Sequence, residues 1–256
     1  MDLQNGEFQK NNIESYKDPL MEVLDDPSVS FEKRIDLLSK LDLLNTRFGI
    51  YKKFINNFES VLGLSGVQSK NISTFEIGSG LGGLSREVYQ SAKNKGLDIE
   101  VNLFDSQGDV LQVSQKYLQT LGVENSIFLA TDEQLKKIPS ESFDYVLSLH
   151  VIHHIRPEEE AVAAIQEMRR IARRGVFIMD FHRKFGSITF FKIWNLFFGI
   201  SEDLNSDGIK SMKRAYNPYE LIAKINKEDS KFPFHVKGSL LEPYWYIYCD
   251  KSIKPT

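Results

Sequence analysis

A glycine-rich turn between a strand-like run and a helical stretch constrains the fold of this chain more than any other part of its sequence. The letters F-E-I-G-S-G-L-G-G-L run from Phe75 to Leu84; residues 72–77 are typical of a strand and residues 84–95 of a helix. Glycines at such a point permit a tight turn and a close approach of the backbone to a ligand, and the free N–H groups of the next helix can bind it. The turn therefore predicts a nucleotide-like ligand beyond the carboxyl end of a strand.

From residue 72 onward, strand-like runs alternate with helical stretches. The expected strands are 72–77, 99–104, 126–130, 143–149 and 175–179, and the expected helices between them are 84–95, 110–121 and 157–173. This alternation predicts an α/β fold with a Rossmann-like doubly wound sheet, mostly parallel, with helices on both faces. After a helix at 218–226, the runs 234–240 and 244–249 predict a final antiparallel pair of strands.

Two further regions are expected beside this sheet. Residues 1–66 predict an N-terminal helical cap, with two helices in 31–64 that separate near 45–49. Residues 67–256 form the α/β domain, which an aromatic-rich insertion interrupts at about 184–216. Because an insertion after the fifth strand lies at the edge where such sheets bind ligands, we expect it to form a helical lid.

Composition excludes several classes of protein. The 256 residues carry a net charge of −3 and contain one cysteine, so we expect no nucleic-acid partner, no internal disulfide and no cysteine-based metal site. The polar N-terminus lacks the apolar core of a signal peptide, and the most apolar stretch, 188–200, is too short to span a bilayer. We expect a cytoplasmic protein without stable membrane insertion and without a bound metal. Nothing in the sequence predicts its oligomeric state.

The glycine spacing alone leaves two kinds of nucleotide open. Gly78, Gly80 and Gly83 fit G-x-G-x-x-G, the dinucleotide pattern, whereas Gly78, Gly80 and Gly82 fit G-x-G-x-G. An acidic residue about 20 positions further on, Asp105, suits both, because a carboxylate there can accept both hydroxyls of a ribose.

Two other acidic residues distinguish these ligands. Glu76 precedes the first glycine by two positions; it would repel a pyrophosphate and attract the ammonium group of S-adenosylmethionine. Asp132, after Thr131 and the third strand, can accept a hydrogen bond from the adenine amine. With Asp105, these carboxylates follow three successive strands and favour S-adenosylmethionine.

These residues resemble the motifs of the class I S-adenosylmethionine-dependent methyltransferases. The run E-I-G-S-G-L-G matches the first motif of that family, and F-D-Y-V-L-S-L-H-V-I-H-H-I, residues 143–155, is similar to its strand-four motif. Within the family, the chain is most similar to the small-molecule branch that includes the ubiquinone and menaquinone methyltransferases. The resemblance covers residues 45–225.

The resemblance implies methyl transfer to an oxygen or carbon of a small, apolar or aromatic acceptor, polyketide-like or quinone-like. It also implies the lining of the cofactor pocket, which is Glu76, Gly78, Ser79, Gly80, Gly82, Asp105, Ser106, Thr131, Asp132, Leu149 and His150. Gln107 departs from the proline that is common in the family's second motif, and this leaves the expected contact of Asp105 with the ribose unchanged.

Three histidines follow the fourth strand and are candidates for catalysis. Methyl transfer requires alignment of donor and acceptor, and a base when the acceptor must lose a proton. We hypothesise that His150 or His153 is the base or orients the acceptor, and that Asp180 after the fifth strand orients a histidine or binds the substrate. Packing or capping of the loop is the alternative for the histidines, and a solvated loop for Asp180 and His182.

An apolar acceptor cavity is expected beneath the lid and the N-terminal cap. The residues expected to bind the acceptor are Arg47, Tyr51, His154, His182, Phe191 and Trp194. The aromatic segment 188–200 has helical spacing, which fits either a lid or part of the core.

The sequence is compatible with three other functions. An NAD-dependent oxidoreductase would use the same turn, although Glu76 and Asp132 argue against it. A non-catalytic partner subunit and an enzyme of non-methyl chemistry would both bind S-adenosylmethionine, because the residues that bind the cofactor are separable from those that carry out the transfer.

Overall fold

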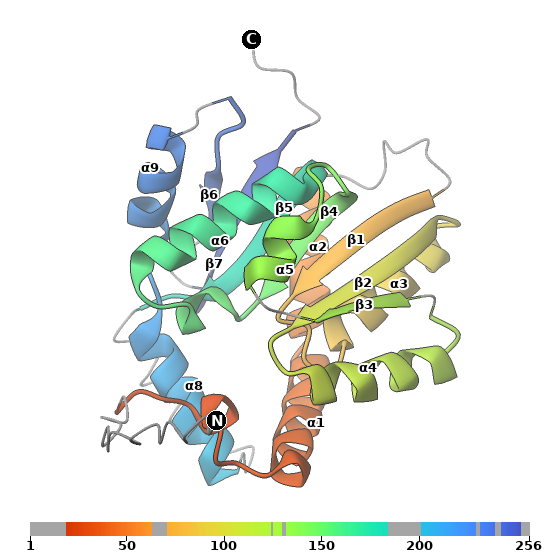
Figure 1. The fold of residues 1–256 in the computed structure, drawn as a ribbon, viewed down its shortest axis with the longest axis vertical. Coiled ribbons are helices and arrows are strands. Elements are labelled where there is room, and N and C mark those ends of the chain that lie inside the picture. The colour runs from red at the N-terminus through yellow and green to blue at the C-terminus, as the bar shows by residue number, and fades with distance from the viewer. Residues whose placement is uncertain are drawn as a thin grey trace, which may run out of the picture.

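The sheet of this computed structural model has a mixed strand order. The structure describes residues 19–62, 71–123, 125–129, 132–183, 201–228, 231–238 and 242–251. Among these, the strands form one seven-stranded sheet in the order β3-β2-β1-β4-β5-β7-β6 (Figure 1). They are β1 (Asn71–Ile77), β2 (Asp98–Asp105), β3 (Asn125–Leu129), β4 (Phe143–Leu149), β5 (Ala172–Phe181), β6 (His235–Lys237) and β7 (Tyr244–Asp250). The strands β1 to β5 are parallel and β7 is antiparallel to both of its neighbours, which confirms the predicted fold.

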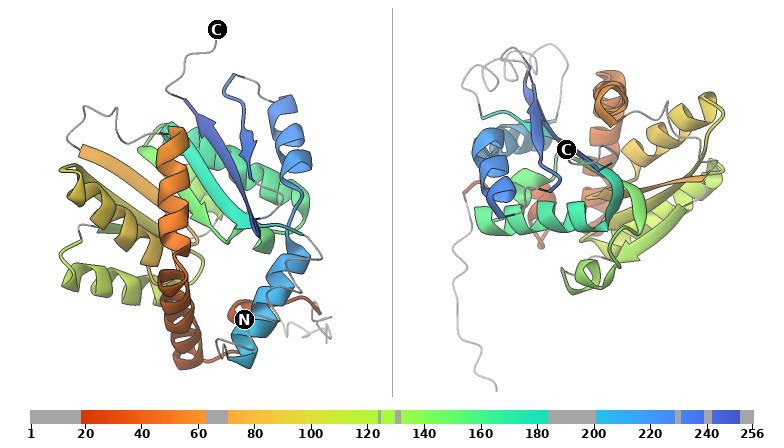
Figure 2. Two further views of the ribbon diagram at one scale, coloured as in Figure 1. Left: turned by 180° about the vertical axis from the view of Figure 1, so that it is seen from behind. Right: turned by 90° about the horizontal axis from the view of Figure 1, so that it is seen from above.

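Helices cover both faces of the sheet (Figure 2). One face carries α2 (Ile50–Leu62), α3 (Gly83–Asn94) and α4 (Gly108–Thr120), and the other carries α5 (Asp132–Lys137), α6 (Glu158–Ile171) and α9 (Pro218–Glu228). Strand side chains alternate between the two cores: Phe177 packs with α2, and Ile178 packs in the core that contains residues of α6. This period-two alternation buries both faces.

Two helices lie at the carboxyl end of the parallel strands, away from the sheet faces. Helix α1 (Phe31–Arg47) and helix α8 (Glu202–Arg214) contact each other there, together with the short helices η1 (Val23–Asp25) and η3 (Ile152–His154). Ser30 is the N-cap residue of α1, and its Oγ accepts the Lys33 N–H. Gly49, with φ of 66°, lies between α1 and α2. The predicted break between the two helices is confirmed.

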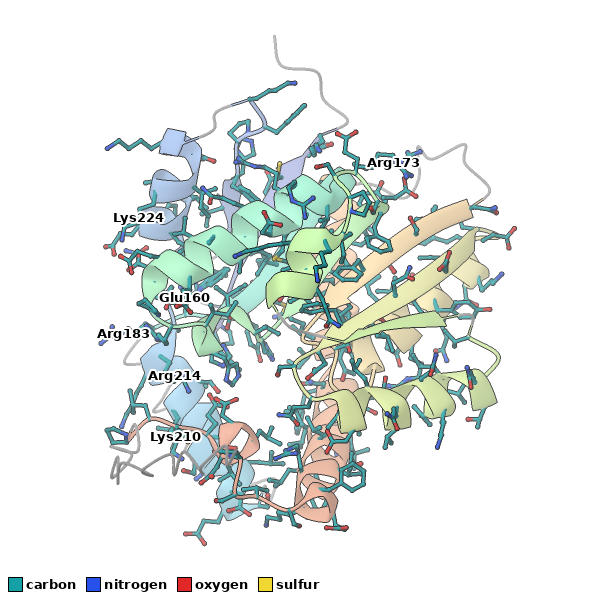
Figure 3. All side chains as sticks on the ribbon, in the orientation of Figure 1. Glu160, Arg173, Arg183, Lys210, Arg214 and Lys224 are labelled. Carbon is teal, nitrogen blue, oxygen red and sulfur yellow. The ribbon has the colours of Figure 1, made fainter. Side chains whose placement is uncertain are left out.

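The sequence placed the boundary between α6 and β5 two residues too late. Arg173 was expected to end the helix, but it belongs with Arg174 to β5, where both contact Oδ1 of the buried Asp144, at 3.1 and 3.0 Å. Pairing of β5 with β4 begins already at Ala172, so strand pairing overrides the helical spacing. Figure 3 shows Arg173 at the opposite end of the molecule from Lys210 and Arg214 of α8. No helix in the described part of the chain is long and apolar enough to cross a membrane.

Candidate active site

The glycine-rich turn leaves β1 after Ile77 and enters α3 at Gly83. Gly78, Gly80 and Gly82 have φ of 71°, 50° and 75°, in the left-handed region that favours glycine. At Gly78 a side chain is also excluded by space, because a Cβ atom would lie 2.3 Å from Cγ2 of Val151. The turn is therefore packed directly against the loop that follows β4.

Gly82 is the last residue of the turn before α3. It is the N-cap residue of α3, and a Cβ atom there would lie 2.8 Å from Oγ of Ser114 on α4. The sequence predicts that Gly82 contacts the cofactor; in the structure it permits the close packing of α3 against α4 and does not line the cavity described below.

Asp105 ends β2 beside this turn. Its Oδ2 accepts the Gly80 N–H at 2.8 Å and its Oδ1 accepts the Gln107 N–H at 3.0 Å. Burial raises the pKa of the Asp105 carboxyl, although these backbone donors oppose the shift. The side chain thus links the turn after β1 to the end of β2.

Glu76 is buried, with 4% of its surface exposed, one residue before the end of β1. Its Oε2 accepts hydrogen bonds from the N–H of Ser85 at 3.0 Å and from its Oγ at 2.5 Å. Burial raises the pKa of Glu76 to about 8, against the Ser85 donors and with a further contribution from the charges of Asp105 and Asp42. A cation bound beside this carboxyl would favour its ionised form.

These residues line a cavity of about 380 Å³, which we call the glycine-turn cavity. Its volume is in the range of small-molecule sites. The predicted cofactor residues that line it are Glu76, Gly78, Ser79, Gly80, Asp105, Ser106, Leu149 and His150. Thr131 lies outside the described residues, and Asp132 begins α5 with a side chain that is not described.

Helices α1 and α2 complete this cavity with Leu38, Leu41, Asp42, Asn45 and Tyr51. The Tyr51 hydroxyl donates to Oδ1 of Asp42 at 2.8 Å, and Arg86 of α3 forms an ion pair with Oδ2 of Asp42 at 3.0 Å. This network fixes the cap to the helix that follows the turn. Tyr51 was predicted to contact the acceptor and instead lines the glycine-turn cavity. Asp42 and Arg86 belong to no motif and were not predicted.

A second cavity of about 200 Å³, the histidine cavity, adjoins the first. The two cavities share Leu24, Leu41, Asn45, His150 and His154. The other walls of the histidine cavity are mostly apolar and include Leu44 and Phe48 of α1, Leu204 and Met212 of α8, Phe181 of β5 and Tyr244 of β7. A ligand in it would lie next to a ligand in the glycine-turn cavity.

His150 stands where the two cavities meet. It has φ of 57°, unusual for a residue with a side chain, and its ring stacks on Phe181 at 4.2 Å and on Tyr244 at 5.3 Å between centroids. Its Nε2 is buried and has no hydrogen-bond partner among the described residues. Burial lowers the pKa of His150 to about 3, so the ring is a neutral imidazole at physiological pH.

His153 and Asp180 form a buried pair beneath the histidine cavity. Nδ1 of His153 lies 2.7 Å from Oδ1 of Asp180, and the His153 N–H donates to Oδ2 at 3.1 Å. Burial lowers the pKa of His153, but the Asp180 and Glu22 carboxylates outweigh it and raise the value to about 9. The pKa of Asp180 is lowered by His153, although burial opposes the shift. Asp180 therefore fixes the orientation of the His153 ring.

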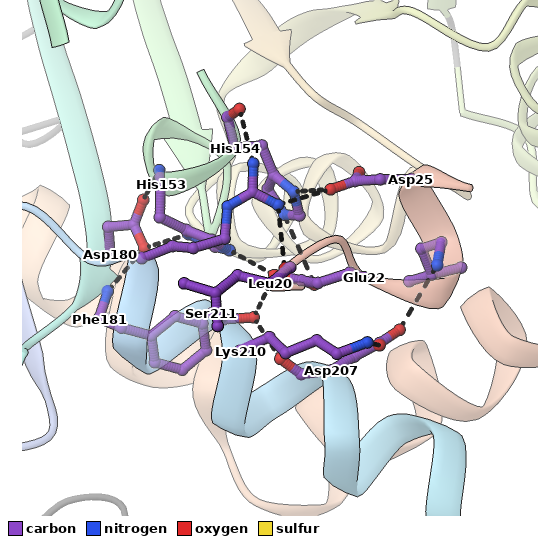
Figure 4. Close-up of polar contacts among 12 residues, drawn as sticks. Leu20, Glu22, Asp25, His153, His154, Asp180, Phe181, Asp207, Lys210 and Ser211 are labelled. Atoms are coloured by element: carbon purple, nitrogen blue, oxygen red, sulfur yellow. Dashed lines mark hydrogen bonds and ion pairs between the residues drawn. The ribbon is translucent and has the colours of Figure 1, made fainter. Parts of the chain in front are cut away.

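His154 is held by the N-terminal segment. Its Nδ1 lies 2.8 Å from Oδ2 of Asp25, and Arg214 of α8 contacts the same carboxylate oxygen at 3.1 Å. The Glu22 carboxylate lies near both His153 and His154, and Figure 4 shows Glu22 between these two histidines and Ser211 of α8. Neither Glu22 nor Asp25 was predicted, because the segment around them has no motif and no periodicity.

Besides Tyr51, two described residues that were predicted to bind the acceptor, Arg47 and His182, do not line the histidine cavity. Arg47 is exposed on α1, because the wall of the histidine cavity is formed by positions 41, 44, 45 and 48, one helical face that excludes position 47. His182 lies beyond the end of β5, donates its N–H to Pro243 at 2.8 Å and lines a different cavity. Phe191 and Trp194 lie outside the described residues, as does most of the expected lid; its last part, from Glu202, is the helix α8.

Comparison with known proteins connects this site to a family. Residues 75–179 match the family described as a methyltransferase domain. The match begins in β1 and ends in β5, and it includes the glycine-rich turn, Asp105 and the loop with the three histidines. Comparison of the sequence with curated proteins finds no match.

Solved structures share the fold of this chain. A protein from Methanococcus maripaludis, provisionally described as an S-adenosyl-L-methionine-dependent methyltransferase, is similar with a TM-score of 0.60 and 15% identity, over 86% of this chain and 94% of that one. A SAM-dependent methyltransferase from Aquifex aeolicus gives 0.53 and 14%, over 84% and 97%. The CurJ carbon methyltransferase gives 0.50 and 15%, over 77% of this chain and 51% of that one.

Proposed function

Because this chain belongs to the class I S-adenosylmethionine-dependent methyltransferases, we propose that it methylates an oxygen or carbon atom of a small, apolar or aromatic acceptor bound in the histidine cavity. The observation that carries this proposal is the contact between the two cavities at His150. One cavity has the acids and glycines that suit the cofactor, and the adjoining one is apolar and closed by side chains of α1 and α8.

The glycine-turn cavity suits S-adenosylmethionine, the expected cofactor, in its charges and in its backbone. The ammonium group of the cofactor would lie near Glu76, whose burial requires a cationic partner for ionisation. The ribose hydroxyls would donate to Asp105, whose oxygens have further lone pairs beyond those used by the backbone. The glycines leave room for the methionine part of the ligand.

The transfer itself is an in-line displacement. The acceptor atom forms a bond to the methyl carbon while the carbon–sulfur bond breaks, which leaves S-adenosylhomocysteine; a hydroxyl or carbon acid also gives its proton to water. The protein contributes mainly the alignment of the two reactants. The neutral ring of His150 lies at the junction of the cavities and can hydrogen-bond an acceptor oxygen through Nε2. His153, whose ring is held by Asp180, lines the acceptor cavity and orients the bound acceptor.

The apolar walls favour a polyketide-like or quinone-like acceptor. Phe48, Phe181 and Tyr244 offer aromatic surfaces to a flat ligand, and Met212 of α8 can adapt to its shape. We place the reaction in the cytoplasm, on the composition argument above. The likeness to a carbon methyltransferase is one of fold and leaves oxygen and carbon as equal candidates for the methylated atom.

A variant that fills the histidine cavity tests this function. Met212→Trp adds volume to a residue that lines the histidine cavity but not the glycine-turn cavity. We expect the affinity for S-adenosylhomocysteine, measured by calorimetry, to stay within about twofold, and methyl transfer to phenolic and 1,3-dicarbonyl acceptors to fall at least about tenfold. Leu43→Trp, at an exposed position of α1, is the matched control and keeps full transfer.

Two outcomes would contradict the proposal. If the unaltered protein binds NAD⁺ in the same calorimetric experiment and not S-adenosylhomocysteine, the cofactor assignment is wrong. If it binds S-adenosylhomocysteine but Met212→Trp transfers methyl groups as well as Leu43→Trp does, the acceptor does not occupy the histidine cavity.

A further inference from the structure

Three potential metal ligands meet at the wall of the histidine cavity. Glu22 lies just before η1, and His153 and His154 lie in η3, after β4. One ligand atom from each of them falls within 4.8 Å of the other two. The sequence predicts no metal site because nothing near the histidines completes a ligand set; the fold supplies Glu22 from the N-terminal segment.

Both histidines are oriented by carboxylates in the same way. Nδ1 of His153 lies 2.7 Å from Asp180, and Nδ1 of His154 lies 2.8 Å from Asp25. A carboxylate on one ring nitrogen fixes the ring and leaves the other nitrogen free, which is the usual arrangement around histidines that bind metals. Here both free nitrogens lie beside Glu22: Nε2 of His153 is 3.5 Å from one oxygen and Nε2 of His154 is 3.9 Å from the other.

The free nitrogen of His153 is an independent sign of a missing ligand. Its side chain is 1% exposed, and Nε2 is buried without a hydrogen bond of acceptable geometry to any described residue. Leaving a buried polar atom unsatisfied costs free energy. Ligand atoms on a common metal ion with bonds of about 2.0–2.2 Å are about 3–3.6 Å apart, so the Glu22 oxygen at 3.5 Å is better placed to share a cation than to accept a hydrogen bond.

The surrounding charges favour a cation. Arg214 neutralises Asp25, with 3.1 Å between Nη1 and Oδ2, and Lys210 lies 3.7 Å from Asp207. Glu22 and Asp180 then remain, both buried, with only the histidines and neutral hydrogen-bond donors such as Ser211, whose hydroxyl donates to Glu22 at 2.8 Å (Figure 4). Two buried carboxylates that contact no lysine or arginine of the described residues favour the binding of one divalent ion.

We propose that Nε2 of His153, Nε2 of His154 and the carboxylate of Glu22 bind a divalent transition-metal ion. Two imidazoles and one carboxylate suit Zn²⁺ and its neighbours Fe²⁺, Co²⁺ and Ni²⁺, whereas Mg²⁺ and Ca²⁺ prefer oxygen ligands only. Three protein ligands leave at least one coordination position for another molecule.

The position of this site indicates the class of acceptor. All three ligands line the histidine cavity, so the open coordination positions face the ligand bound there. This step rests on the proposed function: an acceptor with two neighbouring oxygens, a catechol or an enolisable 1,3-dicarbonyl, would bind the ion through them. The ion would act as a Lewis acid that stabilises the oxyanion left when the acceptor gives its proton to water. That oxyanion, or its enolate carbon, then bonds the methyl carbon as the carbon–sulfur bond breaks, with no redox change.

The test measures metal binding by the full chain without an affinity tag. After chelation and dialysis, titration with Zn²⁺ should show one equivalent bound, and the Co²⁺-loaded protein should show visible absorption bands of a bound ion. Glu22→Gln and His154→Asn should each weaken Zn²⁺ binding at least about 100-fold, and Asp25→Asn by about 10–100-fold. His235→Asn, which removes an exposed histidine of β6, is the matched control and binds Zn²⁺ as the unaltered protein does.

Thermal unfolding of each variant shows whether it is folded, and His154, with 27% of its side chain exposed, is the safer substitution if Glu22→Gln loses the fold. The proposal is overturned if the unaltered protein binds no equivalent of Zn²⁺, or if Glu22→Gln and His154→Asn bind it as tightly as His235→Asn. Binding of S-adenosylhomocysteine to the metal-free protein separates the two proposals: if it persists where Zn²⁺ does not bind, the metal site fails and the methyltransferase function stands.

Discussion

The two cavities of this protein are built from different parts of the chain. The glycine-turn cavity is lined largely by short segments at the ends of β1, β2 and β4, each within or beside a sequence motif. The histidine cavity takes its walls from the N-terminal segment, α1, α8 and β7, which are far apart in sequence. A site that is shaped by the backbone of one turn can be recognised from the sequence. A site where side chains from remote elements meet can be recognised only from the folded structure.

The largest expected effect is that of a substitution in the turn that shapes the glycine-turn cavity. Gly78→Ala adds a Cβ atom at φ of 71° and 2.3 Å from Val151, so we expect a loss of about 2–5 kcal/mol in the free energy of unfolding. Because the turn must move, the affinity for S-adenosylhomocysteine should fall at least about 100-fold. Urea unfolding and calorimetry measure the two effects.

Gly96→Ala separates the backbone strain of a positive φ from the steric contact with Val151. Gly96 has the same φ of 71°, but nothing lies within 4 Å of an added Cβ atom, so this variant suffers backbone strain alone, about 1–2 kcal/mol, and keeps its ligand affinity. Val151→Ala added to Gly78→Ala should recover part of the loss. Equal effects of Gly78→Ala and Gly96→Ala would show that contact with the β4 loop does not shape the turn.

The difference between the cavities also explains what the sequence could and could not predict. Strand and helix order, the antiparallel β7 and the residues from Glu76 to Gly80 follow from periodicity and from a local motif, which need no knowledge of packing. Glu22 and Asp25 could not be found this way, because a polar segment beside a proline acquires its role only when α8 and η3 pack around it. Tyr51 shows the same limit: its helix was predicted, but the sequence did not show that its side chain lines the glycine-turn cavity.

The next effect concerns the charge built into the glycine-turn cavity. Burial raises the pKa of Glu76 to about 8 from 4.5, so the folded, ligand-free protein binds a proton that the unfolded chain releases between these values. Stability from this group is therefore present below pH 4.5 and is lost as the pH rises toward 8, by at most about 1.4 kcal/mol per pH unit. Glu76→Gln should not show this decline, and urea unfolding from pH 5 to 8 compares the two proteins.

Glu100→Gln, on the exposed side of β2, is the control for this experiment and should keep the pH profile of the unaltered protein. Saturating S-adenosylmethionine should reduce the decline in the unaltered protein, because its ammonium group favours the Glu76 carboxylate. If the free energy of unfolding depends on pH in the same way in the unaltered protein and in Glu76→Gln, then Glu76 is ionised in the empty cavity. Its protonation state would then not depend on a cationic ligand.

The smallest expected effects come from substitutions of two neighbouring residues, Arg47 and Phe48, near the wall of the histidine cavity. Phe48 lines that cavity and Arg47, which the sequence favoured, does not. Phe48→Ala removes part of an aromatic wall, so we expect KM for the acceptor to rise about tenfold, or about 1.4 kcal/mol, with the affinity for S-adenosylhomocysteine unchanged. Arg47→Ala should change KM by less than about twofold, because an exposed side chain at the end of a helix makes little difference to a ligand it does not touch. If Arg47→Ala raises KM more than Phe48→Ala does, the acceptor binds outside the histidine cavity, on the surface that Arg47 faces. The face of α1 formed by positions 41, 44, 45 and 48 would then serve only to pack the N-terminal helices.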